Sequence, residues 1–216
     1  MDFLETVENR HSIRDFSDRP VSHDDLVSII NTAKMAPSWA NSQTWKVVVA
    51  TGDTLEKIRQ HHQEAVSQGV RENAEIPSLH RQAMGWQGMK NAGGWIMDIK
   101  RFLAKDSKAM VKDSAALFNA PAVAYLLVPR NPSLWETYDL GAFGQTLMLA
   151  ATNLGIDSIP AMEFVLYPDF LHDILDVDDK YIFAVGIGLG YRKDDALINQ
   201  FRSKRMDNDK FVSFKD

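Results

Sequence analysis

The sequence predicts an α+β sandwich rather than a doubly wound parallel sheet. Segments with helical periodicity and segments with strand character intermingle along the 216 residues without a strict strand–helix–strand repeat, and no internal repeat is visible. Hydrophobic residues make up 45% of the chain and charged residues 25%, which is typical of a globular protein. A chain of this length buries enough surface to need no disulfide or metal, so we expect a single domain over residues 1–216.

The N-terminal part begins with two predicted helices separated by an extended segment. Apolar side chains at helical spacing predict a short helix over residues 2–9, and residues 10–16 alternate polar and apolar side chains as a strand does. Ser22 and Asp25 form a weak capping box that begins a helix ending near Met35. We then expect a polar loop over residues 36–45, a buried strand over residues 47–50 and a helix over about residues 54–68.

Residues 69–115 differ in character from the rest of the chain. They contain five glycines, many charged residues and two of the five tryptophans, Trp86 and Trp95. This composition predicts a helical insertion with loose ends, for which a lid is one interpretation.

The C-terminal part returns to core-forming segments. The apolar run over residues 122–128 predicts a central strand, and residues 135–154 predict a long helix with Gly155 in the C-cap position. Two further strands over residues 158–162 and 181–187 flank a helix around residues 169–175. Beyond Tyr191 the chain is polar and aperiodic, and its candidate anchors are Phe201, Phe211 and Phe214.

Charge and composition exclude several classes of function. Lys and Arg number 24 against 29 Asp and Glu, a formal net charge of -5, so we expect neither nucleic acid nor a membrane as a partner. An anionic ligand would require a local cluster of basic residues. The absence of cysteine excludes thiol catalysis, disulfides and thiolate metal sites. No apolar run approaches the roughly 20 residues of a membrane span, and Met1–Glu5 lacks the basic start of a signal peptide, so the sequence predicts a cytoplasmic protein.

Motifs for dinucleotides and metals are incomplete. Gly186, Gly188 and Gly190 have GxGxG spacing rather than GxGxxG, and a polar tail follows them instead of an amphipathic helix. This arrangement favours close backbone packing at a strand end. The six histidines form neither an HExxH nor an HxH pattern, so no metal site is expected.

Three segments indicate an anionic, planar ligand. Arg10, Ser12 and Arg14 share one face of an extended strand, where two guanidinium groups around a hydroxyl can bind a phosphate and a second electron-rich group. The loop Pro37–Trp45 offers hydroxyl, amide and aromatic groups that suit a heterocycle, and Arg202–Arg205 is a basic cluster. Each segment also has a bland interpretation: a solvated basic edge strand, a loop that caps its own backbone, and solvated surface.

Together these segments resemble the FMN-dependent nitroreductase family of NAD(P)H nitroreductases and related flavin reductases. RHSIRDF at residues 10–16 resembles the family's R-x-S-x-R/K-x-F start. APSWANSQTW at residues 36–45 resembles its A-P-S-x-x-N-x-Q-P-W loop, with Thr44 in place of the usual proline, and the SKR at residues 203–205 resembles its closing basic pair. The resemblance runs from about residue 2 to 212 and breaks at residues 69–115. It implies a nitroreductase-like sandwich with a central, mostly antiparallel sheet flanked by helices, in an intertwined homodimer with two interfacial flavins.

The resemblance also implies roles for individual residues. It places Arg14 near the flavin pyrimidine ring as electrostatic support, and His11 against the flavin through its backbone. The phosphate and ribityl end of FMN would be held by Arg10, Ser12, Lys204 and Arg205, with Ser38, Asn41 and Gln43 coming from the partner subunit. The flavin-facing strand end would be Ala161, Met162 and Glu163, although the family often has Glu-Gly shortly after the proline, so the backbone N–H that faces flavin N5 stays open.

The function implied is an oxidoreductase that transfers hydride from NADH or NADPH through flavin N5 to small electrophiles such as nitroaromatics or quinones, with ping-pong kinetics. The flavin carries the chemistry, so no catalytic side chain is expected. Two alternatives are a non-catalytic FMN-binding redox sensor or flavin store, and a family relative dedicated to one metabolite. Trp86 and Trp95 are candidate residues of the substrate channel, with structural anchoring as the alternative.

Overall fold

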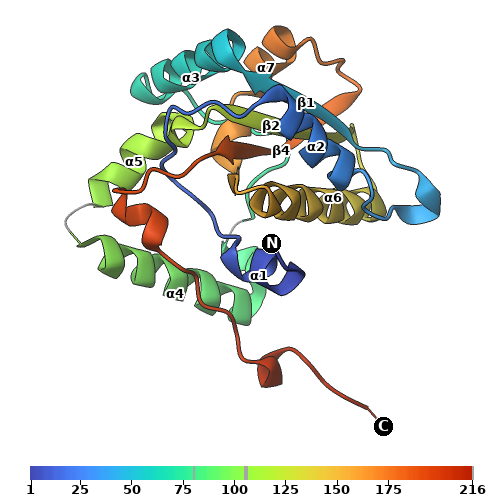
Figure 1. Cartoon of the computed structure of the whole chain (residues 1–216), viewed down its shortest axis with the longest axis vertical. Helices are drawn as coiled ribbons and strands as arrows, with labels where there is room; N and C mark the ends of the chain where they lie inside the picture. The colour runs from blue at the N-terminus through green and yellow to red at the C-terminus, as the bar shows by residue number, and fades with distance from the viewer. Residues whose placement is uncertain (80, 105–106, 216) are drawn as a thin grey trace.

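The computed structural model describes residues 1–79, 81–104 and 107–215, and its centre is a four-stranded sheet flanked by helices (Figure 1). The strand order is β1-β2-β4-β3, and every neighbouring pair is antiparallel. The strands are β1 (Lys46–Thr51), β2 (Ala122–Pro129), β3 (Asp157–Ala161) and β4 (Tyr181–Gly190). The predicted α+β class and the antiparallel sheet are therefore confirmed.

Helices cover both faces of the sheet, and β2 is buried between them. Alternate residues of β2 such as Leu126 and Val128 pack toward α2 (His23–Ala33) and α6 (Leu134–Asn153). The intervening residues, Tyr125 among them, pack toward α3 (Gly52–Ser67) and α7 (Pro168–Leu175). Because successive side chains of a strand point to opposite faces, a strand covered on both faces must be apolar at every position, as the run over residues 122–128 is.

The strand expected over residues 47–50 is present as β1, but the expectation that it is buried is wrong. In β1 only Ala50 is fully buried, while Val49 and both ends of the strand are exposed. The reason is its position: β1 is an edge strand that pairs only with β2, so its side chains have neighbours on fewer sides. Periodicity alone does not separate a short edge strand from a central one.

The three glycines of β4 allow neighbouring segments to lie directly against the strand. A Cβ on Gly186 would lie 2.2 Å from the Cβ of Phe164, and a Cβ on Gly188 would lie 2.8 Å from the Cζ of the same ring. A Cβ on Gly190 would lie 2.6 Å from the Cδ of Pro121. Phe164 belongs to a short 3₁₀ helix that directly follows β3. The GxGxG motif is a packing feature, as the sequence predicts.

Capping residues set the ends of α2 and α6. The Ser22 side chain accepts a hydrogen bond from the N–H of Asp25, which confirms the predicted cap of α2. At the start of α6, Ser133 and Glu136 form a full capping box that the sequence analysis missed. β3 ends at Ala161, before the predicted boundary at Met162, so Met162 lies in the following 3₁₀ helix rather than in the strand.

The remaining helices lie to one side of the sandwich, next to the C-terminal segment (Figure 1). They are α1 (Phe3–Asn9), α4 (Gly85–Leu103) and α5 (Ser107–Ala115). Ile99 and Leu103 of α4 form a small cluster with Ile198 and Phe201, which confirms Phe201 as an anchor of the tail. Phe211 and Phe214 are 62% and 88% exposed, so they do not anchor it within this chain. None of the helices in the described ranges is both long and apolar enough to cross a membrane.

The packing of β4 against Phe164 gives a test by double-mutant cycle. We expect Gly188→Ala to lower the free energy of unfolding by about 1–3 kcal/mol, the usual cost of overpacking a core. In a Phe164→Leu background, which lacks the clashing Cζ, the same substitution should cost clearly less, because the two residues share one contact. Urea denaturation of the four proteins measures this difference, and equal costs in both backgrounds would show that the ring is not the obstacle.

Candidate functional site

The extended segment with Arg10, Ser12 and Arg14 lies along the edge strand β3. Ser12 forms an isolated parallel bridge with Ser158, and the N–H of Ile13 donates to the carbonyl of Ser158 at 3.1 Å. Ile13 itself is completely buried. The alternation predicted for this segment is therefore present, with the apolar residue directed into the core and the basic strip directed away from it.

The strip forms one wall of a pocket of about 630 Å³, which we call the arginine pocket. Gln145 of α6 and the C-terminal segment form its other walls. Its polar and charged lining residues are Glu8, Arg10, His11, Ser12, Arg14, Gln145, Arg202, Ser203 and Arg205. The structure thus brings together five predicted residues, Arg10, His11, Ser12, Arg14 and Arg205, and adds Arg202 and Gln145, to which the resemblance assigned no role.

The arginine pocket concentrates positive charge, because four arginines line it against one carboxylate, that of Glu8. Among the residues that the structure describes, no ion pair joins Arg10, Arg14, Arg202 or Arg205 to an acidic side chain. Burial lowers the pKa of the Arg10 guanidinium, and the neighbouring charges of Arg205 and Arg202 lower it further. Burial also lowers the pKa of Arg14, against an opposing effect of Glu163. A pocket of mutually repelling cations favours an anionic ligand.

Asn199 holds the strip and the C-terminal segment together. Its Oδ1 accepts hydrogen bonds from the N–H groups of Arg14 at 2.8 Å and Asp15 at 3.2 Å. Its Nδ2 donates to the carbonyls of Asp15 at 2.7 Å and Lys193 at 3.1 Å. The side chain is buried, and all four of its hydrogen-bonding positions are used. Sequence reasoning missed this residue, because an asparagine in a polar tail carries no signal of its own.

His11 adds a second link between the same two segments. Its Nδ1 lies 2.8 Å from the carbonyl oxygen of Asn9, and its Nε2 lies 2.9 Å from that of Asn199. Burial lowers the pKa of His11, the hydrogen bonds to the carbonyls of Asn9 and Asn199 oppose this shift, and the charges of Arg202 and Arg192 add to it, so the net effect favours the neutral imidazole. A neutral ring donates from one nitrogen only, and it therefore satisfies one of these two carbonyls at a time.

Trp95 borders the arginine pocket, whereas Trp86 does not. The indole N–H of Trp95 donates to the Oγ of Ser203 at 3.1 Å, and the guanidinium carbon of Arg14 lies 5.7 Å from the centroid of its ring. This is a cation–π arrangement beside the predicted flavin site. Trp86 is 70% exposed on α4, and its nearest cation is Lys90, with Nζ 5.2 Å from the ring centroid.

Lys204 points to a different neighbour from the one that the resemblance implies. Its Nζ lies 3.0 Å from the Oδ2 of Asp98 on α4, and the residue does not line the arginine pocket. It lines instead a groove between α4 and the C-terminal segment. Arg205 lines both the groove and the arginine pocket.

The loop that carries Ser38, Asn41 and Gln43 does not reach the arginine pocket of its own chain. Asn41 and Gln43 are exposed and Ser38 is half-buried, and all three bond within the loop: the N–H of Gln43 donates to Ser38 Oγ at 3.1 Å, and Gln43 Nε2 donates to Asn41 Oδ1 at 2.9 Å. The N–H of Trp39 donates at 2.9 Å to the buried carboxylate of Asp139 on α6, which fixes the loop on that helix. Both Asn41 and Gln43 have positive φ angles, so the loop is held in a specific, strained shape.

The end of β3 leads into an apolar hollow next to the arginine pocket. Pro160 lines this hollow of about 370 Å³, together with one face of α6 that includes Gly141 and Gly144. Gln145 lines both the hollow and the arginine pocket, so the two spaces adjoin. The three predicted residues that follow Pro160 are only partly buried: Ala161, Met162 and Glu163.

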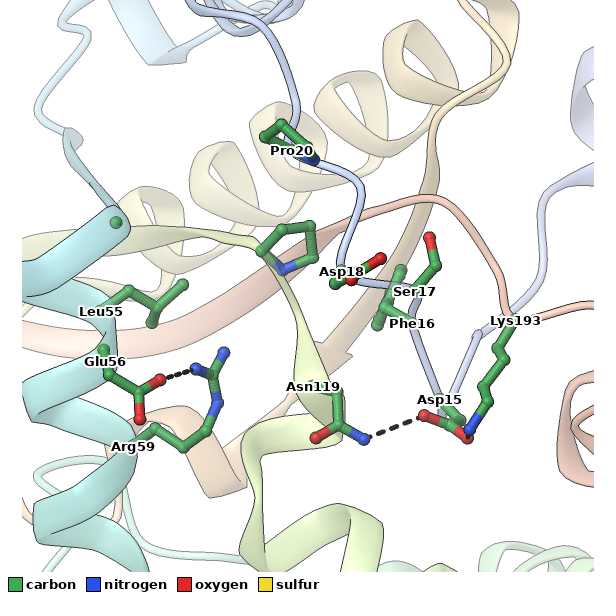
Figure 2. A pocket seen from close by; sticks show the side chains of 12 residues that line it. Asp15, Phe16, Ser17, Asp18, Pro20, Leu55, Glu56, Arg59, Asn119 and Lys193 are labelled. Carbon is green, nitrogen blue, oxygen red and sulfur yellow. Dashed lines mark hydrogen bonds and ion pairs between the residues drawn. The ribbon is translucent and has the colours of Figure 1, made fainter.

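Another cavity, of about 860 Å³, lies between α3 and the chain around residues 15–20, and both cations that line it pair with carboxylates (Figure 2). Asn119 Nδ2 donates to Asp15 at 2.9 Å, and Lys193 Nζ lies 3.5 Å from the same carboxylate. Arg59 donates to two backbone carbonyls and to Glu56. Burial and the nearby charge of Asp15 raise the pKa of Asp113 to about 6. With both of its cations paired, this cavity lacks the unbalanced positive charge of the arginine pocket.

Comparisons with known proteins agree with this geometry. The sequence model described as the Nitroreductase family matches residues 7–191. A 4-nitrobenzoate reductase of Pseudomonas putida is 27% identical over 215 residues, which cover 94% of this chain and 91% of that protein. Nitroreductase NfnB of Mycolicibacterium smegmatis is 27% identical over 207 residues, which cover 92% and 86% of the two chains.

Comparison of the fold with solved structures also identifies a nitroreductase. The crystal structure of the FMN-dependent nitroreductase NfnB from Mycobacterium smegmatis in complex with NADPH matches with a TM-score of 0.90 and 25% identity, over the whole of both chains. The nitroreductase-like sandwich expected from the sequence is therefore confirmed. With a family match over most of its length and a fold match over all of it, the chain belongs to the Nitroreductase family.

Proposed function

We propose that the protein is an FMN-dependent oxidoreductase that uses NADH or NADPH to reduce small electrophiles, with nitroaromatics and quinones as acceptors. The observation that carries the proposal is the arginine pocket, where Arg10, Arg14, Arg202 and Arg205 converge without an acidic partner among the described residues. The names of the relatives, one a 4-nitrobenzoate reductase and one an FMN-dependent nitroreductase bound to NADPH, support the same chemistry.

The shape of the site suits FMN. The arginine pocket offers guanidinium groups and the Ser12 hydroxyl to a single terminal phosphate, and the adjoining hollow offers an apolar surface beside Gln145. Bound there, FMN would supply an N5 atom that takes hydride from the nicotinamide and gives it to the acceptor. Arg14 is the residue of the strip that lies next to Trp95, where its charge would stabilise a reduced, anionic flavin ring.

In this proposal the side chains of the protein bind and orient the flavin and its substrates and exclude water from the site. None of them acts as a nucleophile. Trp95 supports the proposed substrate channel, because its ring lies beside Arg14 at the edge of the pocket. The donor and the acceptor would use one site in turn, and from this we expect ping-pong kinetics. We propose that residues 69–115, which include α4 and α5, are an insertion within a single domain.

We also propose that the working protein is a homodimer. Asn41 and Gln43 are exposed, Ser38 is half-buried, and all three lie outside the arginine pocket of their own chain, so a second subunit is needed to bring them to a flavin. Large apolar side chains near this loop and at the start of α6 are exposed in the single chain: Trp39, Leu134, Trp135 and Tyr138. Such a surface is typical of an interface between subunits.

The first test is the cofactor and its reduction. The purified protein should release FMN and no FAD on acid treatment, because the pocket offers its basic side chains to one phosphate. Anaerobic addition of NADPH or NADH should bleach the flavin absorbance within a turnover time, and a nitroaromatic or quinone should restore it. A flavin that stays oxidised with both nucleotides would favour the non-catalytic redox sensor or flavin store over the oxidoreductase.

The second test removes one phosphate contact. Arg10→Ala should weaken FMN binding by about 10-fold or more, since a hydrogen bond to a charged group contributes about 1.5–3 kcal/mol. Fluorescence titration of the apoprotein with FMN measures the change. Arg71→Ala, at an exposed arginine outside the pocket, is the matched control and should bind FMN as the wild type does. Equal affinity in both variants would remove Arg10 from the site.

The third test is the oligomeric state. Light scattering of the holoprotein should give a species of twice the 24.4 kDa chain mass, and removal of FMN should shift the equilibrium toward monomer, because the flavin would be bound by both subunits. A 24.4 kDa species with full flavin occupancy would contradict a shared site.

A further inference from the structure

A second groove, of about 650 Å³, lies between α4 and the C-terminal segment around residues 201–211, and we call it the α4 groove. On the helix side, Lys90, Gly94, Trp95 and Asp98 line it from one face of α4, as their spacing requires. Its chemistry is defined by three cations and three aromatic rings: Lys90, Lys204, Arg205, Trp95, Phe201 and Phe211.

The α4 groove is positively charged in a protein of negative net charge. Three cations line the groove, and Asp98 is the single carboxylate among its lining residues. That carboxylate pairs with the Nζ of Lys204 at 3.0 Å. The formal charge of the chain is -5, so a basic groove is a local feature and not a consequence of composition. Cations interleaved with aromatic rings are the groups that bind a nucleotide, because rings stack on the base while cations bind phosphate.

The floor of the groove contains a glycine where a helix gains nothing from one. Gly94 lies in the interior of α4, and glycine is, after proline, the least favourable residue for a helix interior. A Cβ at Gly94 would meet no atom within 4 Å, so packing against the protein does not require the glycine either. The missing side chain leaves a flat surface beside Trp95, on which a planar ring can lie.

The α4 groove adjoins the arginine pocket. Phe201 and Arg205 line both spaces, so a ligand in the groove would lie next to a flavin whose phosphate occupies the pocket. The ligand that a flavin reductase must bring to this place is its reduced nicotinamide nucleotide.

We propose that the α4 groove binds the adenosine half of NADPH, with the adenine between Trp95 and the surface over Gly94 and the 2′-phosphate at Lys90. The inference rests on the proposed function and adds to it a preference for NADPH. NADPH and NADH differ only in the 2′-phosphate, so a cation in the groove separates them by charge, whereas contacts to the adenine do not.

The central experiment fills the groove without disturbing the fold. Gly94→Leu in the holoenzyme places a side chain over the groove floor, and Gly93→Leu is the matched control, because Gly93 also has open space around its Cβ and does not line the groove. Both substitutions improve helix propensity, so neither should lower the melting temperature. We expect Gly94→Leu to raise KM for NADPH about 10-fold or more, the effect of losing a stacked base, and Gly93→Leu to change it less than about two-fold.

A second variant tests the 2′-phosphate. Lys90→Gln should raise KM for NADPH and leave KM for NADH unchanged, and adenosine 2′,5′-bisphosphate should inhibit the wild type in competition with NADPH but inhibit Lys90→Gln more weakly. Lys100→Gln, at an exposed lysine of the same helix outside the groove, is the control. FMN content and the flavin spectrum should be those of the wild type in all variants.

The outcomes separate this inference from the function on which it rests. If NADPH and NADH both fail to bleach the wild-type flavin, the proposed function is wrong. If NADPH reduces the flavin and Gly94→Leu keeps the KM of the wild type, the function stands and the α4 groove is not the nucleotide site. If Lys90→Gln raises KM for NADPH and NADH equally, the assignment of the 2′-phosphate to Lys90 is overturned.

Discussion

The buried amide of Asn199 is the interaction on which the arginine pocket depends. Arg10 and Arg14 enter the pocket from one end of the chain and Arg202 and Arg205 from the other, and like charges do not assemble unaided. Three of the four hydrogen bonds of Asn199 join the two backbones, and His11 adds a fourth link through the carbonyl of Asn199. Because the amide is fully satisfied inside the protein, removing it would leave buried backbone groups without partners, a larger loss than the bonds themselves contribute.

Close packing against glycines of β4, rather than hydrogen bonding, positions the opposite side of the site. Gly186 and Gly188 let Phe164 lie directly on β4, and Phe164 follows the end of β3 by three residues. The close approach fixes where β3 ends, and Pro160 at that end lines the apolar hollow. The missing side chains of β4 thus determine where the neighbouring strand β3 ends and lines the apolar hollow. The same principle recurs in α4, where Gly94 opens the groove floor.

Features that depend on local spacing could be predicted from the sequence, and features that depend on an aperiodic chain could not. The strip Arg10–Arg14 and the cap at Ser22 follow from fixed periodicities and were predicted. Arg202–Arg205 lies in a segment without regular structure, where spacing does not tell which side chains share a face, so Lys204 was assigned to the phosphate although it pairs with Asp98. The role of Asn199 needed the fold, since three of its four hydrogen bonds join residues more than 180 positions away in the sequence.

The wide separation of Asn199 from its N-terminal partners in the sequence affects the order in which the holoprotein forms. His11 and Asn199 are 188 positions apart, so nearly the whole chain must leave the ribosome before the walls of the arginine pocket can meet. The guanidinium groups of the N-terminal strip therefore stay solvated while the sheet folds. At the site that we propose, flavin loading would then be a late event in biogenesis, and a chain that ended shortly before residue 199 would have its sandwich core but not the walls of the arginine pocket.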